Sequence, residues 1–448
     1  MKRSILGRWL ITLWLPATAF AIPAPSTQEF ILDNGLKLIV HEDHRSAVVH
    51  THLWYRVGSN NEPPGQSGIS HAVEHMVFNG SSKLCSGEGD HILQTLGGSD
   101  NATTRNDTTL YFQTLAPHAL GVSFEILADR MSTAHLSAAQ WLGEREVIKN
   151  ERSESVDNSH VQRGLEMTLR IASPSSAAGN PTIGWKHDID RLNVEELQHW
   201  YRRWYAPNNA ILVVTGGIET EHVKALAERY FGGIARREVP VNKIALEVAA
   251  PGERKITQYF AHQPAMLHML FNVPSMSTQT DPRTAPSLEL LRELLAGGRS
   301  ALLNAQLVHN EALLIAVTAE YNAISRSDEL FSITSFPDLE KAKSTDAATQ
   351  RIWAVIDSLK NAPPALEDLE RARTQLIAQQ VFKRDELEDH ARYLGELEIA
   401  DLSWRTEQAR LDVMKSITPE DIQRTAQRFL VRDRLTTSAV LPLERAHE

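Results

Sequence analysis

The sequence predicts an α+β protein made of two similar halves, each a mostly antiparallel sheet with helices. The 448 residues are 42% hydrophobic and 23% charged, which is an ordinary globular composition that can bury sizeable cores. Hairpin-like strands stand beside blocks of long helices, and this favours α+β over a parallel doubly wound sheet. Two weak internal repeats have nearly the same period, which predicts a duplicated unit.

The two repeats join helices and strands in the same order. Residues 192–215 and 417–441 match at an offset of 225, and each reads as a capped helix start followed by a strand. Residues 70–80 and 287–297 match at an offset of 217, and each reads as a helix that a Ser could cap and a Gly could end.

Apolar periodicity and turn residues predict the remaining elements in order. The first half has strands at 30–41 (with a turn at 33–35), 47–57, 108–114 and 210–215, and helices near 68–79, 88–96, 117–131, 138–155 and 194–204. The second half has strands within 256–273 and 313–335 and helices near 339–360 and 366–398.

Residues 1–21 are typical of a secretory signal peptide. A positively charged start precedes the apolar run 9–16, and Ala19-Phe20-Ala21 forms a small-residue cleavage site. The run is too short to span a bilayer, and no Cys follows it, so we expect neither a membrane anchor nor a lipid anchor. The predicted domains are then 22–240 and 255–448, joined by a linker at 241–254 where the pattern breaks.

Charge and cysteine content exclude several classes of function. Lys and Arg number 46 against 56 Asp and Glu, a net charge of −10, so binding to nucleic acid through phosphate attraction is not expected. The single cysteine, Cys85, excludes an internal disulfide framework and a Cys-based zinc finger. The histidines of the strand-like segment 41–52 are taken as ordinary strand residues.

The strongest chemical signal is His71-Ala-Val-Glu74-His75. On a helix, His71 and His75 project from one face and can reach one zinc ion at about 2.0–2.1 Å. Glu74 lies beside them and can take a proton from a water molecule that the zinc activates. This H-x-x-E-H order inverts the commoner H-E-x-x-H zinc motif. The alternative is a set of polar residues on an ordinary amphipathic helix.

A catalytic zinc needs a third protein ligand, and the predicted helix 138–155 offers several carboxylates. Glu144 and Glu151 are seven residues apart and share one face, while Glu146 and Glu154 lie nearby. Spacing alone does not choose among the four, and a solvated charged face is the plain alternative.

With these residues the sequence resembles the pitrilysin/insulinase (M16) family of zinc peptidases. The resemblance rests on four segments and covers almost the whole chain after residue 21: GISHAVEHMVFNG at 68–80, GGSDNAT at 97–103, EREVIKNE at 144–151 and YAPNNAILVVTG at 205–216.

The resemblance implies a fold and a set of roles. The fold would be two pitrilysin-like domains that face each other as a clamshell. His71, His75 and Glu151 would bind one Zn²⁺ per chain, Glu74 would be the general base, and Glu144 would support the site. Residues 101–111 would form an edge strand to which extended peptides add, with Asn101 near the scissile bond.

The chain departs from the family pattern in its second half. Leu288, Leu291 and Arg292 stand where the zinc motif would be, so this half cannot bind zinc in the same way. Val308 and Ile315 stand where many relatives carry an Arg and a Tyr that hold substrate, and Arg299 and Tyr321 are in another register.

The predicted function is that of an exported, periplasmic zinc metalloendopeptidase that cleaves extended or unfolded peptides. Because some relatives divide the zinc site and the Arg/Tyr pair between two chains, we hypothesise that this is the zinc-bearing subunit of a heterodimer with a related chain. The alternative is a non-catalytic assembly or scaffold subunit of the same fold.

Overall fold

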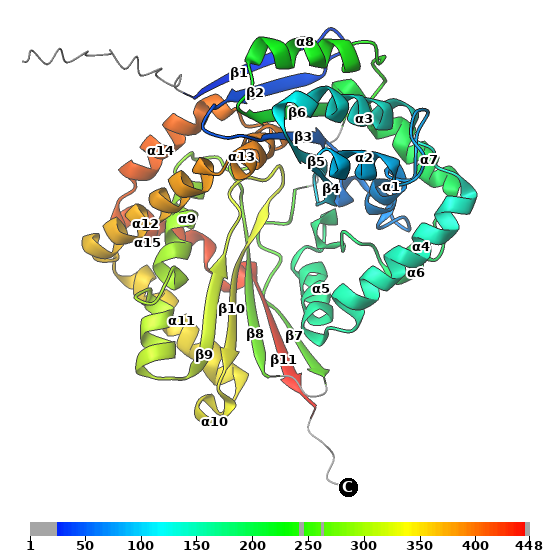
Figure 1. The fold of residues 1–448 in the computed structure, drawn as a ribbon. Coiled ribbons are helices and arrows are strands. Elements are labelled where there is room, and N and C mark those ends of the chain that lie inside the picture. Colours follow the sequence, from blue (N-terminus) through cyan, green and yellow to red (C-terminus); the bar gives the residue numbers. More distant parts are fainter. Residues whose placement is uncertain (1–24, 242–245, 261–263, 444–448) are drawn as a thin grey trace, which may run out of the picture.

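The computed structural model describes residues 25–241, 246–260 and 264–443. These residues form two sheets, one from each half of the chain, with helices packed on both (Figure 1). The fold is α+β with two similar parts, as the sequence predicts. The predicted signal peptide, residues 1–21, lies outside the described residues.

The first sheet has six strands in the spatial order β1-β2-β6-β3-β5-β4. All neighbours are antiparallel except β2 and β6, which run parallel. The central strands β3 and β6 are buried along their whole length, which suits a sheet covered on both faces. The strands are β1 (Ser26–Ile31), β2 (Lys37–Glu42), β3 (Val49–Tyr55), β4 (Ser99–Thr104), β5 (Thr109–Leu115) and β6 (Ala210–Gly216).

The second sheet repeats this topology. Its order is β7-β11-β8-β10-β9, which matches β2-β6-β3-β5-β4 strand for strand. The pair β7 and β11 is parallel, like β2 and β6, and the other pairs are antiparallel. The strands are β7 (Arg254–Phe260), β8 (Met266–Val273), β9 (Leu314–Glu320), β10 (Glu329–Pro337) and β11 (Leu435–Pro442).

Each sheet encloses its own apolar core beneath helices of its own half. The first half carries α1 (Ile69–Val77), α2 (Glu88–Thr95), α3 (Leu120–Thr133), α4 (Ala138–Arg152), α5 (His160–Ala172), α6 (Lys186–Ile189), α7 (Val194–Trp204) and α8 (Thr220–Phe231). The second half carries α9 (Thr284–Ala296), α10 (Leu339–Ala342), α11 (Thr345–Asn361), α12 (Leu366–Asp385), α13 (Leu387–Ile399), α14 (Glu407–Ser416) and α15 (Pro419–Phe429).

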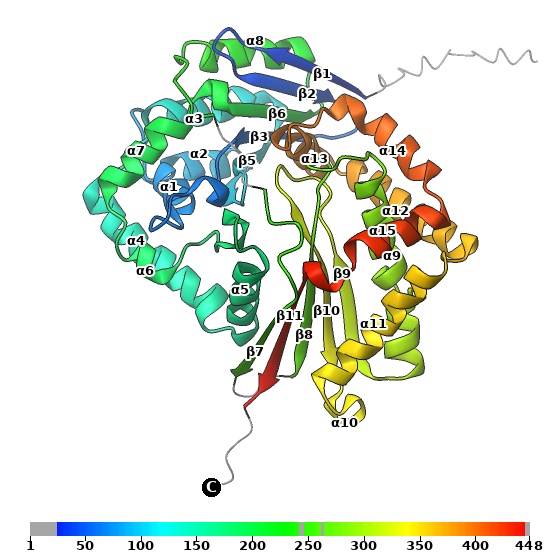
Figure 2. The ribbon, with the colours of Figure 1, turned by 180° about the vertical axis from the view of Figure 1, so that it is seen from behind.

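Each half also lends one helix to the sheet of the other half, and Figure 2 shows these helices from behind. Helix α13 packs on β3 and β6, while α5 packs on β7 and β11. The contacts are close, since a Cβ added at Gly395 of α13 would come within 2.2 Å of the Trp54 ring. A Cβ at Gly164 of α5 would come within 3.0 Å of Val440. The two halves are therefore interlocked.

The repeat at an offset of 225 is confirmed in detail. Helices α7 and α15 begin with capping boxes made by Asn193 with Glu196 and by Thr418 with Asp421, and each precedes a central strand. The second repeat pairs α1 with α9, which follow equivalent strands. The predicted Ser caps are wrong, because the helices begin after Gly68 and Arg283 and both serines lie inside them.

Other parts of the prediction needed correction. Helices α5, α6, α8 and α14 were not predicted, and the predicted helix 366–398 is two helices that break at Glu386. The edge strand expected over 101–111 is β4 alone, because the chain turns where Arg105 N donates to Thr108 O. Residues 109–111 belong to β5, which has neighbours on both sides. Within the described residues, no helix is long and apolar enough to cross a membrane.

Histidines line the contact between the first sheet and α13. The rings of His41 on β2 and His390 on α13 lie 4.3 Å apart, and neither ring nitrogen of His390 has a hydrogen-bond partner. His52 on β3 is buried against Phe112. Burial lowers the pKa of His52 and of His390 to about 3, and it also lowers the pKa of His41 and His50.

We expect acid to destabilise the protein through these histidines. An imidazole held neutral in the folded state contributes its full stability above the unfolded pKa of 6.5, and this stability is lost as the pH falls toward the folded value. For a folded pKa near 3, the loss by pH 5 is roughly 2 kcal/mol per imidazole. Urea unfolding at pH 8 and pH 5 measures it. His390→Phe should reduce the pH dependence, while His222→Phe, at an exposed position on α8, should leave it unchanged. Equal pH dependence in the wild type and His390→Phe would contradict this assignment.

Candidate metal centre

The helix α1 carries His71, Glu74 and His75, and its first turn is held by buried polar contacts. Gly68 precedes the helix with a φ of 85°, in the left-handed region that favours glycine. The Glu62 carboxylate accepts hydrogen bonds from the backbone N–H groups of Gly68 and Ser70 at 2.8 and 2.9 Å. A carboxylate at this end of a helix also complements the helix dipole.

His71, His75 and Glu151 converge although α1 and α4 are far apart in sequence. Glu151 Oε2 lies 3.6 Å from His71 Nε2 and 3.4 Å from His75 Nε2. One ligand atom from each residue can be chosen so that all three lie within 4.8 Å of one another. The structure thus brings together the two histidines and one of the four carboxylates that spacing left open.

This donor set fits a zinc ion. Tetrahedral ligands at 2.0–2.1 Å from one zinc lie about 3.3 Å apart, close to the observed separations. His75 turns its other ring nitrogen, Nδ1, toward Glu144 Oε2 at 3.2 Å, an arrangement that fixes the orientation of a ligating histidine. Glu146 instead pairs with Lys149 at 3.3 Å, and Glu154 is exposed beyond the end of α4.

The end of α4 is anchored next to Glu151. Arg152 is buried, and it donates to Gly184 O at 2.7 Å and to Glu166 of α5 at 2.9 Å. A π-helical segment, Ser153–Asp157, follows at once, and such segments widen a helix locally. This anchor could not be predicted from the sequence, because the partners of Arg152 lie on other elements.

The surroundings shift the pKa values of the three cluster residues in different directions. Burial, helped by the nearby His75, lowers the pKa of His71 to about 4. Burial opposes charge on His75 as well, but the carboxylates of Glu151, Glu74 and Glu144 outweigh it and raise the His75 pKa. The hydrogen bond from His75 leads the effects that hold the pKa of Glu151 below its usual value.

Glu74 lies beside these residues without joining the cluster. Its side chain is buried, and burial raises its pKa to about 7 against the lowering effect of a hydrogen bond from Thr104 and of the nearby His75. A carboxyl group with a pKa near neutrality can both accept and release a proton at neutral pH.

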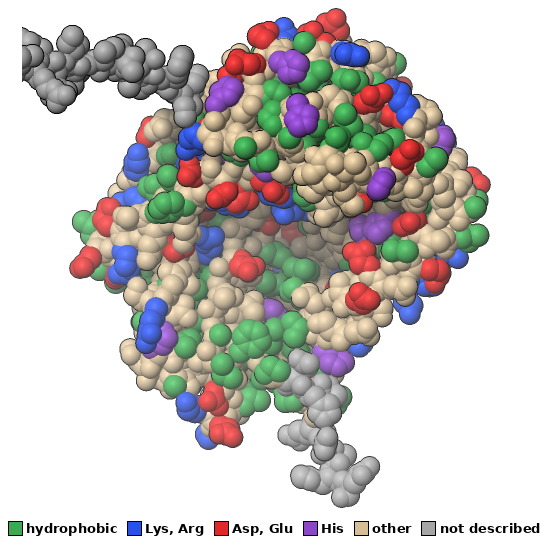
Figure 3. Space-filling model, in the orientation of Figure 1, with side chains coloured by type: hydrophobic (Ala, Val, Ile, Leu, Met, Phe, Trp, Pro, Cys, Tyr) green, Lys and Arg blue, Asp and Glu red, His purple; other side chains and the backbone are tan. Residues whose placement is uncertain are grey.

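Strand β4 ends next to α1 and is an edge of the first sheet, since it pairs with β5 alone. Asn101 lies on it with an exposed side chain, and its Oδ1 accepts a hydrogen bond from the N–H of Ala102 at 2.8 Å. Figure 3 shows that the surface is hollowed between the two halves. The sequence did not predict a role for Thr104 or Glu62, which are linked to α1 only in the folded chain.

The two positions at which the resemblance would place an Arg and a Tyr carry apolar side chains in this chain. Val308 is half-buried, and Ile315 on β9 is 64% exposed. Tyr321 is buried and donates to Pro274 O at 2.8 Å, so its hydroxyl is engaged within the protein. Leu288 and Leu291 are buried in the core of the second half.

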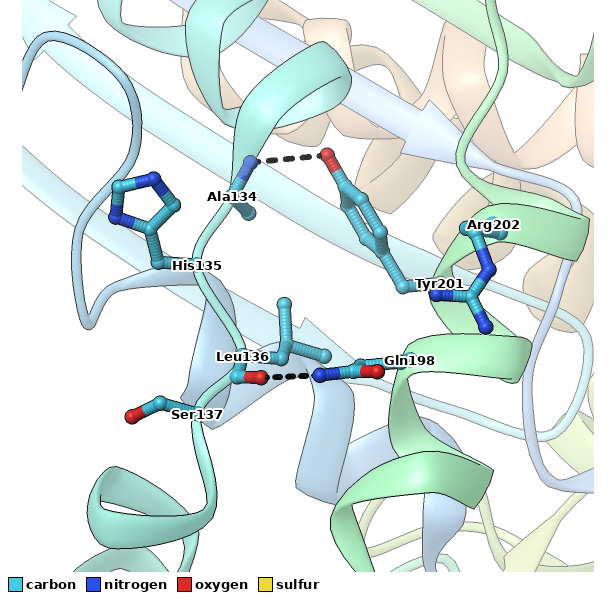
Figure 4. Close-up of a pocket in the computed structure, with 7 residues that line it drawn as sticks. All are labelled: Ala134, His135, Leu136, Ser137, Gln198, Tyr201 and Arg202. Atoms are coloured by element: carbon cyan, nitrogen blue, oxygen red, sulfur yellow. Dashed lines mark hydrogen bonds between the residues drawn. The ribbon is translucent and has the colours of Figure 1, made fainter.

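Two other features have a structural explanation. Glu42, His44 and Glu219 also lie close together, but Glu42 Oε2 accepts from Thr220 N and Oγ1 at the start of α8 and so serves the helix end. A pocket of about 470 Å³ lies between α7 and the loop before α4 (Figure 4). Tyr201 and Gln198 close it with hydrogen bonds to the loop backbone, and no member of the His71 cluster lines it.

The sequence is similar to those of known peptidases. Residues 37–184 match the family model described as Insulinase (Peptidase family M16), and residues 191–376 match Peptidase M16 inactive domain. Zinc protease PqqE of Helicobacter pylori is 26% identical over 356 residues, which cover 78% of each chain. Mitochondrial-processing peptidase subunit beta of Lentinula edodes is 23% identical over 427 residues, covering 91% of this chain and 88% of its own.

Solved structures share the fold. The crystal structure of a protease from Helicobacter pylori matches with a TM-score of 0.86 at 23% identity, and covers 93% of this chain and 100% of its own. The periplasmic protease PqqL of Escherichia coli matches with a TM-score of 0.79 at 17% identity, over 94% of this chain and 48% of its own. These two similarities establish the fold of this chain and do not establish its function.

We expect Glu144→Gln to weaken zinc binding by about 10- to 100-fold, because it removes the carboxylate that orients His75. Glu151→Gln should weaken it further, since it replaces the carboxylate of the cluster by a neutral amide. Competition with a chromophoric chelator measures both affinities. Glu146→Gln is the matched control on the same helix and should bind zinc like the wild type. An equal loss in Glu144→Gln and Glu146→Gln would indicate a general charge effect and contradict the assignment.

Proposed function

The chain belongs to the M16 family of peptidases, and we propose that it is an exported zinc metalloendopeptidase acting on extended peptides. The single observation that carries this proposal is the convergence of His71, His75 and Glu151 beside the buried carboxyl group of Glu74. Domains 22–240 and 255–448 would be the zinc-bearing part and its zinc-free counterpart. The zinc-protease relatives support the chemistry.

The mechanism assigns one task to each residue. His71, His75 and Glu151 would hold one zinc per chain, which when bound polarises a peptide carbonyl and makes water easier to deprotonate. Glu74 takes the proton from the attacking water and delivers it to the nitrogen of the leaving amine. Glu144 keeps the His75 ring oriented through its Nδ1–H.

Extended peptides are the proposed substrates because the edge of β4 is unpaired. A peptide can add to such an edge through backbone hydrogen bonds, which grip the chain with little selection of side chains. The Ala102 N–H now bonded to Asn101 is a donor that a substrate carbonyl could take. Asn101 would then lie beside the bound peptide.

We also propose that this chain works with a second, related chain. The apolar Val308 and Ile315 cannot donate hydrogen bonds to a substrate carbonyl or oxyanion, so a partner would supply the Arg/Tyr pair. The name of the Lentinula edodes relative, a subunit of a processing peptidase, is consistent with a task shared between two chains.

Export to the periplasm is part of the same proposal. It rests on the charged start, the apolar run and the A-x-A site within residues 1–21. The PqqL neighbour is described as periplasmic, which is in keeping with this location.

A non-catalytic assembly or scaffold subunit is the competing function. The match of residues 191–376 to an inactive-domain model begins after the His71, His75 and Glu151 cluster, so it does not speak against that cluster. A scaffold would have no need of Glu74 beside a complete ligand cluster, and this favours the peptidase.

We expect Glu74→Gln to abolish turnover of a quenched fluorescent, unstructured peptide while the protein still binds one zinc. The amide removes the proton acceptor but leaves the ligands in place, so the loss should be at least 100-fold. Zinc content is measured in the same samples. Glu146→Gln again serves as the control. Unchanged turnover in Glu74→Gln would rule out the proposed mechanism.

The partner proposal predicts one bound zinc and weak cleavage by the purified mature chain alone. Addition of a related chain that carries the Arg/Tyr pair should raise kcat by about 100-fold, the size expected when donors to a developing oxyanion are restored. Peptide turnover with and without that chain measures the effect. Robust cleavage by the monomer would show that the chain is self-sufficient.

A further inference from the structure

The hydroxyl of Thr104 makes a contact that the proposed mechanism does not use. Thr104 Oγ1 donates to Glu74 Oε2, and this is the only hydrogen bond of the Glu74 side chain among the described residues. Glu74 Oε1 therefore keeps its acceptor capacity for water. The contact joins the last residue of β4 to the middle of α1.

The surroundings of Thr104 favour donation of its hydroxyl proton to Glu74. Among the described residues, its one other acceptor is Thr109 Oγ1 on β5, at the longer distance of 3.5 Å. Thr109 donates its own proton to Val57 O at 3.0 Å, so it does not compete for Glu74. Burial of Glu74 in a region of low dielectric strengthens the hydrogen bond it receives.

The alternation of side chains along β4 gives the strand two different faces. Asp100, Ala102 and Thr104 share one face, and Asp100 pairs there with Arg130 at 2.6 Å. Asn101 and Thr103 lie on the opposite face, where Asn101 is exposed. One short strand thus carries the proposed peptide edge and the donor to the proposed base.

We propose that Thr104 is a positioning residue that holds the Glu74 carboxyl group with Oε1 directed toward the His71, His75 and Glu151 cluster. This inference rests on the proposed function.

The proton transfers of the proposed mechanism are compatible with Thr104 as a positioning residue. During the reaction a proton moves from water to Glu74 Oε1 and then to the amine nitrogen of the leaving product. Thr104 keeps its own proton and donates to Oε2 in both protonation states of Glu74. The orientation of the carboxyl group is therefore maintained through the whole transfer.

The first test uses variants that differ by the hydroxyl group. Thr104→Val keeps the shape and suits a strand, and it should lower kcat for the quenched peptide by about 10- to 100-fold, with KM and zinc content unchanged. Thr104→Ser restores the donor and should recover most of the rate. Thr51→Val is the matched control, because Thr51 Oγ1 is a buried hydroxyl of the same sheet without a hydrogen-bond partner.

The second test does not depend on turnover. In zinc-loaded crystals, the Glu74 carboxyl group should keep one orientation in the wild type and in Thr104→Ser, and should spread over more than one in Thr104→Val. If the wild type cleaves nothing even with the related chain added, the proposed peptidase function fails while this readout still decides the role of Thr104. A fixed Glu74 in Thr104→Val, a kcat within twofold of the wild type, or a Thr104→Ser variant as slow as Thr104→Val would each overturn the inference.

Discussion

The geometry of the candidate zinc centre depends on how the first turn of α1 is held. Glu62 is fully enclosed and still accepts two backbone N–H groups, and burial raises its pKa to about 7 against those hydrogen bonds. Beside it, a Cβ at Gly68 would come within 2.6 Å of Ile183 O, so the backbones touch where only glycine fits. The Asp188 carboxylate accepts hydrogen bonds from the backbone N–H and from the hydroxyl of Ser67. A helix fixed in this way can present His71 and His75 to a carboxylate on a distant helix.

Local chemistry explains which parts of this centre could be predicted from sequence. The i, i+4 spacing places His71 and His75 on one face through helix geometry alone. The long helix near 138–155 can likewise be predicted from its sequence pattern. The choice of Glu151 over its neighbours was available only through family resemblance, because it depends on the angle between α1 and α4. Strands with strong apolar runs and the two capping boxes were also local signals, which is why the duplication at an offset of 225 could be read.

The features that sequence did not reveal are those made by contacts between distant segments. The face of α5 that packs on the second sheet carries the small buried residues Gly164, Thr168 and Ala172, so its burial partner lies some 90 residues away, as in the bond from Gln258 to Gly164 O. The hydroxyl of Thr104 is an ordinary strand side chain until β4 is placed against α1. Arg152 looks like one more charge on a polar helix until Glu166 and Gly184 enclose it.

The exchange of α5 and α13 limits how the molecule can admit a substrate. Separating the two halves would expose Trp54, Leu110 and Ile211, which pack beneath α13, and each large apolar side chain costs about 1.5–3 kcal/mol when brought into water. It would also break the ion pair from Lys37 to Glu398 at 2.6 Å. Opening at this junction is therefore unfavourable, and under the proposed function a peptide would have to reach β4 with the two halves still joined. A narrow extended chain would meet that condition more easily than a folded domain, so the interlocked fold supports the proposal of extended substrates.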